Sequence, residues 1–148
     1  FLEITGGMLT HMDGEQVRFE IFEPSEALAT GEVLSLEEKF LAGEGQNITP
    51  ARFSEDSERF RAISDQVRAD LQKAAELLGV KGYSRIDAFV RVKGNEVDTI
   101  VIEINSLPGM TPATCIFHQC AINGYKPYEF IDKILQFAAD SQSSVWSR

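Results

Sequence analysis

The sequence predicts an α+β fold, in which a largely antiparallel sheet packs against helices. Two pairs of strand-like segments are each joined by a turn sequence, which is the pattern of antiparallel hairpins. One long segment between the pairs, and two segments after them, have the character of helices. The chain has 148 residues, of which 43% are hydrophobic and 25% charged, and these values suit one compact globular domain.

The first strand pair is expected at residues 2–10 and 16–23, around the turn Met12-Asp13-Gly14-Glu15. Apolar residues at every other position give its second strand one apolar face. Residues 24–52 are rich in glycine, proline and charge. We therefore expect an irregular stretch there, of the kind that is usually functional or mobile.

A long amphipathic helix is expected at residues 55–78, where it would cover the second strand pair. Ser54 is placed to cap its first turn, and Gly79 is the type of residue that ends a helix. Its apolar stripe follows helical spacing. The members of the stripe are Phe60, Ile63, Val67, Leu71, Ala74 and Leu78.

The second strand pair, at residues 83–93 and 97–105, surrounds the turn Lys93-Gly94-Asn95-Glu96 and carries most of the chemistry. The apolar faces of its strands must coincide, because a one-residue slip would turn a whole strand over. Directly paired residues share a face and lie about 5 Å apart. On the apolar face we expect Ile86 to pair with Ile104 and Ala88 with Ile102, and Ile100 to continue this face. On the polar face we expect Asp87 to pair with Glu103 and Arg85 with Asn105.

The polar face of this hairpin gathers two carboxylates, an amide oxygen and a guanidinium. Such oxygen ligands suit Mg²⁺, which takes a few carboxylates and completes its shell with water and phosphate. Taken alone, the pattern is explained better by a solvated face, since acidic residues are common on exposed strands. The next segment, Ser106 to Thr111, favours a binding site: a glycine turn before a capped helix suits an anion, and Gly109 permits close approach to the backbone.

Two further helices are expected at residues 113–123 and 127–139, separated by Gly124. Thr111 can cap the first of them, with Pro112 in its first turn. Residues 141–148 are polar and are expected to form a frayed tail, so that the domain comprises residues 1–140.

Composition excludes several classes of function. The net charge of -9 argues against nucleic acid as a general partner, because phosphate binding needs a basic face. No apolar run approaches the ~20 residues that a membrane-spanning helix needs. Cys115 and Cys120 lack metal-ligand spacing and are expected to be reduced thiols in a cytoplasmic protein. His11 and His118 show no partner in the sequence, so we interpret them as polar surface groups rather than acid–base catalysts.

Two runs of residues resemble a known family. They are Gly82-Tyr83-Ser84-Arg85-Ile86-Asp87 and Ile102-Glu103-Ile104-Asn105-Ser106-Leu107-Pro108-Gly109-Met110-Thr111, and they are similar to the end of the ATP-grasp domain of D-alanine–D-alanine ligases. The similarity extends upstream through residues 37–43, which resemble the mobile loop of those enzymes, to Leu2-Glu3-Ile4-Thr5. It implies an ATP-dependent ligase that joins D-alanine to D-alanine through an acyl phosphate, for peptidoglycan precursor synthesis.

The resemblance also implies how the hairpin works. Asp87, Glu103 and Asn105 would bind Mg²⁺, or Mn²⁺ as an alternative. Two ions are expected, and Glu103 would bridge them. Arg85 and the backbone N–H of Gly109 would stabilise the tetrahedral intermediate.

The remaining implied roles concern the substrates. Glu3 would hold the ribose of ATP and Lys39 would contact its phosphates, while Thr114 and Cys115 would bind the second substrate. Thr114 stands where the family usually has serine and keeps the hydroxyl; Cys115 stands where it has leucine. Phe40 replaces the usual tyrosine and is associated with D-alanyl-D-lactate ligases, so D-alanine and D-lactate both stay open as second substrate.

The enzymes of that family begin with a substrate-binding domain and the first half of the ATP-grasp domain, to which nothing in this sequence corresponds. We therefore expect a fragment of a longer, homodimeric enzyme that is inactive alone. Two alternatives stay open, namely a non-catalytic ATP-grasp-like module that binds nucleotide, and a ligase for other amino acids.

Overall fold

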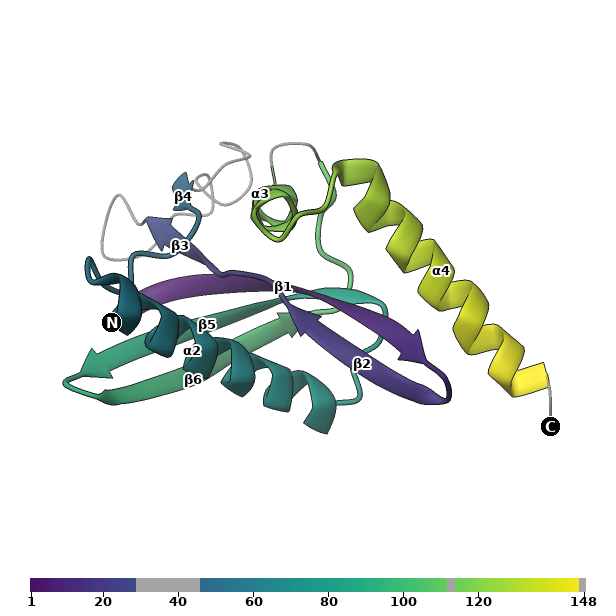
Figure 1. Cartoon of the computed structure of the whole chain (residues 1–148), viewed down its shortest axis with the longest axis horizontal. Helices are drawn as coiled ribbons and strands as arrows, with labels where there is room; N and C mark the ends of the chain where they lie inside the picture. Colours follow the sequence, from purple (N-terminus) through teal and green to yellow (C-terminus); the bar gives the residue numbers. More distant parts are fainter. Residues whose placement is uncertain (29–45, 112–113, 147–148) are drawn as a thin grey trace.

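A computed structural model describes residues 1–28, 46–111 and 114–146, and it confirms the predicted α+β class (Figure 1). Six strands form one sheet in the order β4-β3-β1-β5-β6, with β2 also paired to β1. Every pair of neighbouring strands is antiparallel. The strands are β1 (Leu2–Asp13), β2 (Gln16–Ile21), β3 (Ser25–Leu28), β4 (Gln46–Ile48), β5 (Tyr83–Lys93) and β6 (Glu96–Asn105).

Strand β1 lies at the centre of the sheet. Strand β5 runs along one of its edges from Leu2 to Leu9, whereas β3 and β2 share the other edge. The predicted first hairpin is therefore confirmed, although β1 extends to Asp13. Strands β3 and β4 are a correction, because we expected residues 24–52 to be irregular. They are short and pair through their backbones, which a side-chain pattern does not record.

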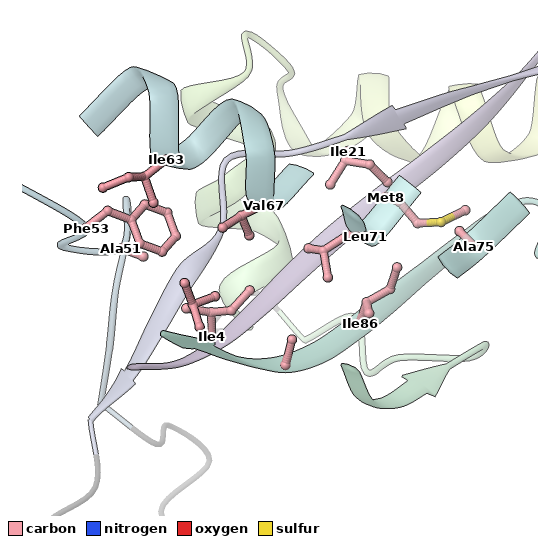
Figure 2. Packing of buried hydrophobic residues seen from close by; sticks show 12 residues of the cluster. Ile4, Met8, Ile21, Ala51, Phe53, Ile63, Val67, Leu71, Ala75 and Ile86 are labelled. Atoms are coloured by element: carbon pink, nitrogen blue, oxygen red, sulfur yellow. The ribbon is translucent and has the colours of Figure 1, made fainter. Parts of the chain in front are cut away.

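Helix α2 (Ser57–Leu77) covers one face of the sheet, as predicted. Its inward residues Ile63, Val67 and Leu71 pack against Ile4 and Ile86 in the larger hydrophobic core (Figure 2). On the edge strand β6, Thr99 Oγ1 donates a hydrogen bond to Asp70 Oδ2 of the helix at 2.8 Å.

The ends of α2 differ from the prediction in detail. Its N-cap is Asp56, whose carboxylate accepts the Arg59 N–H at 2.8 Å, while Ser54 Oγ instead accepts the N–H of Asp56. Gly79 ends the helix as expected, with φ of 64° in the left-handed region. Leu78, which we assigned to the apolar stripe, is exposed: it is the C-cap residue, and Ala75 is the last residue of α2 that is buried against the sheet.

Helices α3 (Cys115–Ile122) and α4 (Pro127–Trp146) lie on the opposite face of the sheet. Leu9 and Phe22 pack there against Ile116, Cys120 and Phe130 in a second core. No described helix has the length and apolarity needed to cross a membrane.

The starts and ends of these helices also correct the prediction. Helix α3 begins at Cys115 rather than at residue 113, with Thr114 rather than Thr111 in the N-cap position. Helix α4 continues to Trp146, so residues 141–146 are helical instead of frayed. Gly124 separates the two helices, as predicted, with φ of 87°.

The β5–β6 hairpin contains an irregularity that the sequence did not reveal. Lys93 pairs with Glu96, so the turn has two residues, and a bulge at Ile102 shifts the register by one. Ala88 consequently pairs with Val101 instead of Ile102, whereas Asp87 still pairs with Glu103. Between the bulge and the turn, the side chains of β6 therefore point to the opposite side of the sheet from the one predicted. Val97 points to the core, and Ile100 and Ile102, which were predicted to be buried, are about half exposed.

Candidate active site

Four polar residues meet on the sheet face that carries α3 and α4. Asp87 is paired with Glu103 across β5 and β6, and Arg85 is paired with Asn105. On the other side of β5, Asp87 is paired with Thr5 of β1. The predicted polar pairs are therefore confirmed, and three strands contribute to one polar patch.

Arg85 is the centre of this patch. Its Nε and one terminal nitrogen donate to the two oxygens of Asp87, at 3.0 and 2.9 Å, and the same terminal nitrogen lies 3.6 Å from Glu103 Oε1. Burial alone would lower the pKa of Arg85, but the Asp87 carboxylate, with smaller effects from Cys115 and Glu103, raises it above its ordinary value. The guanidinium is thus a fixed positive charge held in one orientation.

The two carboxylates differ in their access to solvent. The Asp87 side chain is 19% exposed and that of Glu103 is 60% exposed. Two negative groups face one positive group, so the patch keeps an excess negative charge. Among the described residues, no three His, Cys, Asp or Glu side chains are grouped as a metal site. The possible ligands in the patch are two carboxylates and an amide, which is fewer than a metal ion held by protein ligands alone would need.

Asn105 and Gly109 lie in the segment that leaves β6. Asn105 Oδ1 accepts the Leu107 N–H at 3.3 Å, which shapes the first turn of this segment. Gly109 is exposed, and a Cβ built on it would lie 3.9 Å from the Cγ2 atom of Thr114. The segment therefore brings the backbone of Gly109 next to the start of α3.

The start of α3 stands over the patch. Thr114 Oγ1 donates to the carbonyl oxygen of Thr111 at 2.8 Å. The charges of Arg85 and Asp87 act on the half-buried thiol of Cys115, the next residue. Burial raises the pKa of this thiol and outweighs the lowering by Arg85, so the thiol is neutral at pH 7.

Thr5 is a site residue that the sequence did not single out. Its side chain is only 7% exposed, and its Oγ1 makes no hydrogen bond of ordinary geometry, although it lies beside the Cys115 thiol. The signal that would have found it is the pairing of β1 with β5. These strands are about 80 residues apart in the chain, and no turn sequence links them.

Other predicted residues lie further away or are not described. Glu3 pairs with Phe89, one rung along the same face from the Thr5–Asp87 pair. Lys39 and Phe40 lie outside the described residues. His118 is exposed. His11 is six positions from Thr5 along β1, which places it about 20 Å away at the usual rise of a strand. Contrary to our expectation His11 has a partner, because its Nε2 lies 2.6 Å from Glu20 Oε2.

A pocket of about 670 Å³ lies away from this patch, and none of the predicted site residues lines it. Arg52 in its wall is tied to Glu26 by two side-chain hydrogen bonds of 2.9 and 2.7 Å. These bonds hold the pKa of the Glu26 carboxyl below its ordinary value. Because none of the residues predicted for catalysis or metal binding lines this pocket, we place the candidate active site at Arg85 and Asp87 instead.

Comparison with known proteins finds one matching family and several relatives. Residues 3–136 match the sequence model of the family described as "D-ala D-ala ligase C-terminus". A D-alanine–D-alanine ligase of Syntrophobacter fumaroxidans is 31% identical over 140 residues, which cover 94% of this chain and 40% of that protein. A D-alanine–D-alanine ligase of Citrifermentans bemidjiense is 32% identical, covering 86% of this chain and 41% of that protein. The chain thus spans about two fifths of the length of these relatives.

Solved structures share the fold. A D-alanine–D-alanine ligase of Bacillus anthracis, described as complexed with ATP, superposes with a TM-score of 0.65 at 19% identity, over 97% of this chain and 40% of that one. D-alanyl-alanine synthetase A of Vibrio cholerae gives a TM-score of 0.64 at 20% identity, over 92% of this chain and 38% of that one.

Proposed function

Because this chain belongs to the D-ala D-ala ligase C-terminus family, we propose that the protein containing it is an ATP-dependent ligase that joins D-alanine to D-alanine. The reaction would pass through an acyl phosphate of the first D-alanine, which the amine of the second then attacks. The observation that carries this proposal is the patch in which Asp87 and Glu103 flank Arg85 beneath the start of α3.

The donor set of the patch fits Mg²⁺ bound together with nucleotide. Asp87, Glu103 and Asn105 would hold the metal through oxygen atoms, and phosphate and water would complete the coordination that the protein leaves open. Bound Mg²⁺ supplies electrostatic screening of the phosphate charges. The excess negative charge of the patch supports a divalent cation, and Mn²⁺ is a chemical alternative with the same ligands.

Arg85 and Gly109 would act on the reacting carbonyl. The Arg85 guanidinium is already oriented by its two bonds to Asp87, so it can stabilise a developing oxyanion with little reorganisation. The N–H of Gly109 would be a second donor. Because Gly109 has no side chain and is exposed beside Thr114, it leaves space for a ligand at this point.

The two remaining groups of residues would bind the substrates. Thr114 and Cys115 would contact the carboxylate of the second amino acid, from the start of the helix that stands over Arg85. Glu3, one rung along the sheet, would bind the ribose of ATP, and Lys39 would contact the phosphates. The ATP bound to the Bacillus anthracis ligase supports a nucleotide as the energy source.

The wider role follows from the same family. We propose that the enzyme makes peptidoglycan precursors in the cytoplasm, and that residues 1–140 form the C-terminal part of its ATP-grasp domain. The other three fifths of the relatives' length would supply the rest of the nucleotide and substrate sites, in a homodimeric enzyme. The isolated chain should then bind ATP weakly, since a ligand pocket needs contacts on more than one side.

The direct test is ADP release by the full-length protein with ATP, Mg²⁺ and D-alanine, together with mass spectrometry of the product. We expect ADP and D-alanyl-D-alanine in equal amounts. Nucleotide binding without D-alanine-dependent turnover would instead indicate a non-catalytic module, and turnover only with other amino acids would indicate a ligase of different specificity.

A D-alanyl-D-lactate ligase is the second candidate, and Phe40 is the observation that favours it. Phenylalanine fills a volume similar to that of tyrosine but offers no hydroxyl for the hydrogen bonds that close a loop. D-lactate also carries no ammonium group that must lose a proton before attack. If Phe40 sets the second substrate, the wild type should form measurable depsipeptide, more at lower pH, and Phe40→Tyr should form less. An unchanged product ratio would remove Phe40 from specificity.

A further inference from the structure

Gln119 is a polar side chain in the middle of α3 that is completely buried. Its Oε1 accepts the N–H of Gly7 at 2.7 Å, and its Nε2 donates to the carbonyl oxygen of Thr5 at 2.8 Å. The same Nε2 lies 2.8 Å from Ser25 Oγ of β3. A side chain of the helix therefore bonds to the backbone of β1 much as a neighbouring strand would.

The place of this contact in the sheet explains why the amide is needed. Along one edge of β1, strand β3 pairs with Ile4 and Thr5, and strand β2 pairs from Met8 onward. Gly7 falls between these two strands. Its N–H is buried and points to Gln119, so a residue without an acceptor at position 119 would leave that N–H without its partner.

The contact is also close enough to fix the height of the helix. A Cβ built on Gly7 would lie 2.5 Å from Gln119 Oε1 and 3.1 Å from a side-chain carbon of Ile116. Glycine at position 7 thus lets α3 approach the backbone of β1. Hydrogen bonds are directional, so they fix the rotation of the helix as well as its height, which apolar packing does less specifically.

The amide is coupled to the start of α3 by helical spacing. Cys115 is four residues before Gln119, so the two side chains lie on the same face of the helix. Gln119 holds the carbonyl of Thr5, and Thr5 pairs with Asp87. Cys115 stands where the charges of Arg85 and Asp87 reach its thiol. One buried amide therefore ties the first turn of α3 to the strand beside the carboxylate pair.

We propose that Gln119 is a positioning residue, which sets the height and rotation of α3 over Arg85 and Asp87 and so determines the affinity for the second amino acid. This rests on the proposed function, in which Thr114 and Cys115 contact that amino acid. Gln119 itself touches no substrate; it acts through the position of the first turn of its helix.

The kinetic test uses the full-length protein with three variants. Gln119→Met keeps the side-chain volume and removes all of the side chain's hydrogen bonds. Ser25→Ala removes the contact of Gln119 with β3, together with the 2.6 Å hydrogen bond between Ser25 Oγ and Thr49 Oγ1. The matched control is Tyr125→Phe, which removes the 2.8 Å bond from Tyr125 to Glu20, another link between the helices and this face of the sheet. Circular dichroism checks that each variant is folded.

We expect Gln119→Met to raise the KM for the second amino acid by about tenfold or more, because a displacement of about 1 Å is that costly in a site. The KM for ATP should stay within about twofold, and Ser25→Ala should shift the amino-acid KM in the same direction by less. Tyr125→Phe should leave both values unchanged. Equal changes in both KM values, or no change in either, would overturn the proposal.

A second measurement does not depend on catalysis. Iodoacetamide alkylation of Cys115, followed by peptide mass spectrometry, reports how closely the first turn of α3 is held to the sheet. Gln119→Met should speed this reaction by about tenfold, since a loosened turn opens more often, and Tyr125→Phe should not. If the wild type shows no turnover with D-alanine, the proposed function fails while this comparison still tests the positioning role. If both Gln119→Met and Ser25→Ala are alkylated at the wild-type rate, the positioning role is overturned. If Gln119→Met does not fold, the alkylation rate in Ser25→Ala alone decides whether the positioning role stands.

Discussion

Asp87 lies directly opposite Glu103 although the hairpin turn alone would pair Asp87 with Ile102. The turn has two residues, and the extra residue Ile102 moves the pairing by one position between Val101 and Glu103. This bulge places both carboxylates on the face covered by α3. Bulges often direct a side chain beside an active site, and here the bulge brings Glu103 within 3.6 Å of the guanidinium of Arg85.

Gly109→Ala should separate binding from stability. A Cβ at this position would have its nearest neighbour at 3.9 Å, which is ordinary contact, so the free energy of unfolding should change by less than about 0.5 kcal/mol. The methyl group would occupy space that the proposed ligand needs beside the Gly109 N–H, so kcat/KM should fall at least about tenfold. Full activity in a stable variant would show that no ligand approaches this backbone.

Gly7→Ala should have the opposite pattern, with stability affected first. The added methyl would lie 2.5 Å from Gln119 Oε1, in a region where Ile116 and Phe22 are also close. We expect a loss of about 1–3 kcal/mol in the free energy of unfolding, which is usual for overpacking. Urea denaturation of Gly7→Ala and Gly109→Ala in parallel tests this, and equal midpoints would contradict the close packing of α3 on β1.

Tyr125 gives a prediction about alkaline pH. Its pKa is raised from 10.0 to about 12, first by burial and then by its hydrogen bond to Glu20. The stabilisation is complete below pH 10, where the phenol is protonated in both states, and it is lost as pH rises from 10 to 12, because the unfolded state ionises first. Tyr125→Phe should therefore lose stability less steeply than the wild type over that range. Parallel curves of unfolding free energy against pH would contradict the assignment.

Cys120 contributes to the same alkaline range and remains in both proteins. Burial, and to a smaller extent Glu20, raise the pKa of its thiol to about 12. Both proteins should consequently lose some stability above pH 9, and only the difference between them reports Tyr125.

The sequence predicted those parts of the fold that repeat a local pattern. The hairpin pairs Asp87–Glu103 and Arg85–Asn105, the α2 residues Ile63 and Val67, and the end at Gly79 all follow from periodicity or backbone preference. These two pairs were predicted correctly, although the turn has two residues where the expected strands left three, whereas Ala88 pairs with Val101 instead of the predicted Ile102. A three-residue turn without a bulge and a two-residue turn with a bulge at Ile102 give the same pairing for the residues of β6 that follow Ile102.

What the sequence did not predict depends on contacts between distant segments. Ile100 looks like a core residue in the alternating pattern, but the bulge and the edge position of β6 leave it 49% exposed. Gln119 follows the exposed His118 and looks like another surface position, and only the gap between β2 and β3 shows why a buried amide is needed there. Thr5 joins the site through the pairing of β1 with β5, for which no local signal exists.

The central claim is that the carboxylate pair beneath α3 holds the metal of an ATP-dependent ligase, and one comparison on the same hairpin tests it. Asp87→Asn removes a carboxylate that is bonded to Arg85, and Asp98→Asn removes one that is bonded to Arg91 at 2.8 Å, several rungs away. The measurement is D-alanine-dependent ADP release by the full-length protein across Mg²⁺ concentrations. We predict that kcat falls by about a hundredfold or more in Asp87→Asn and that more Mg²⁺ is needed, because several kcal/mol of charge stabilisation are lost. Asp98→Asn should stay within about twofold of the wild type, as an exposed ion pair contributes little. Wild-type rates in Asp87→Asn at low Mg²⁺, or equal losses in the two variants, would contradict the account.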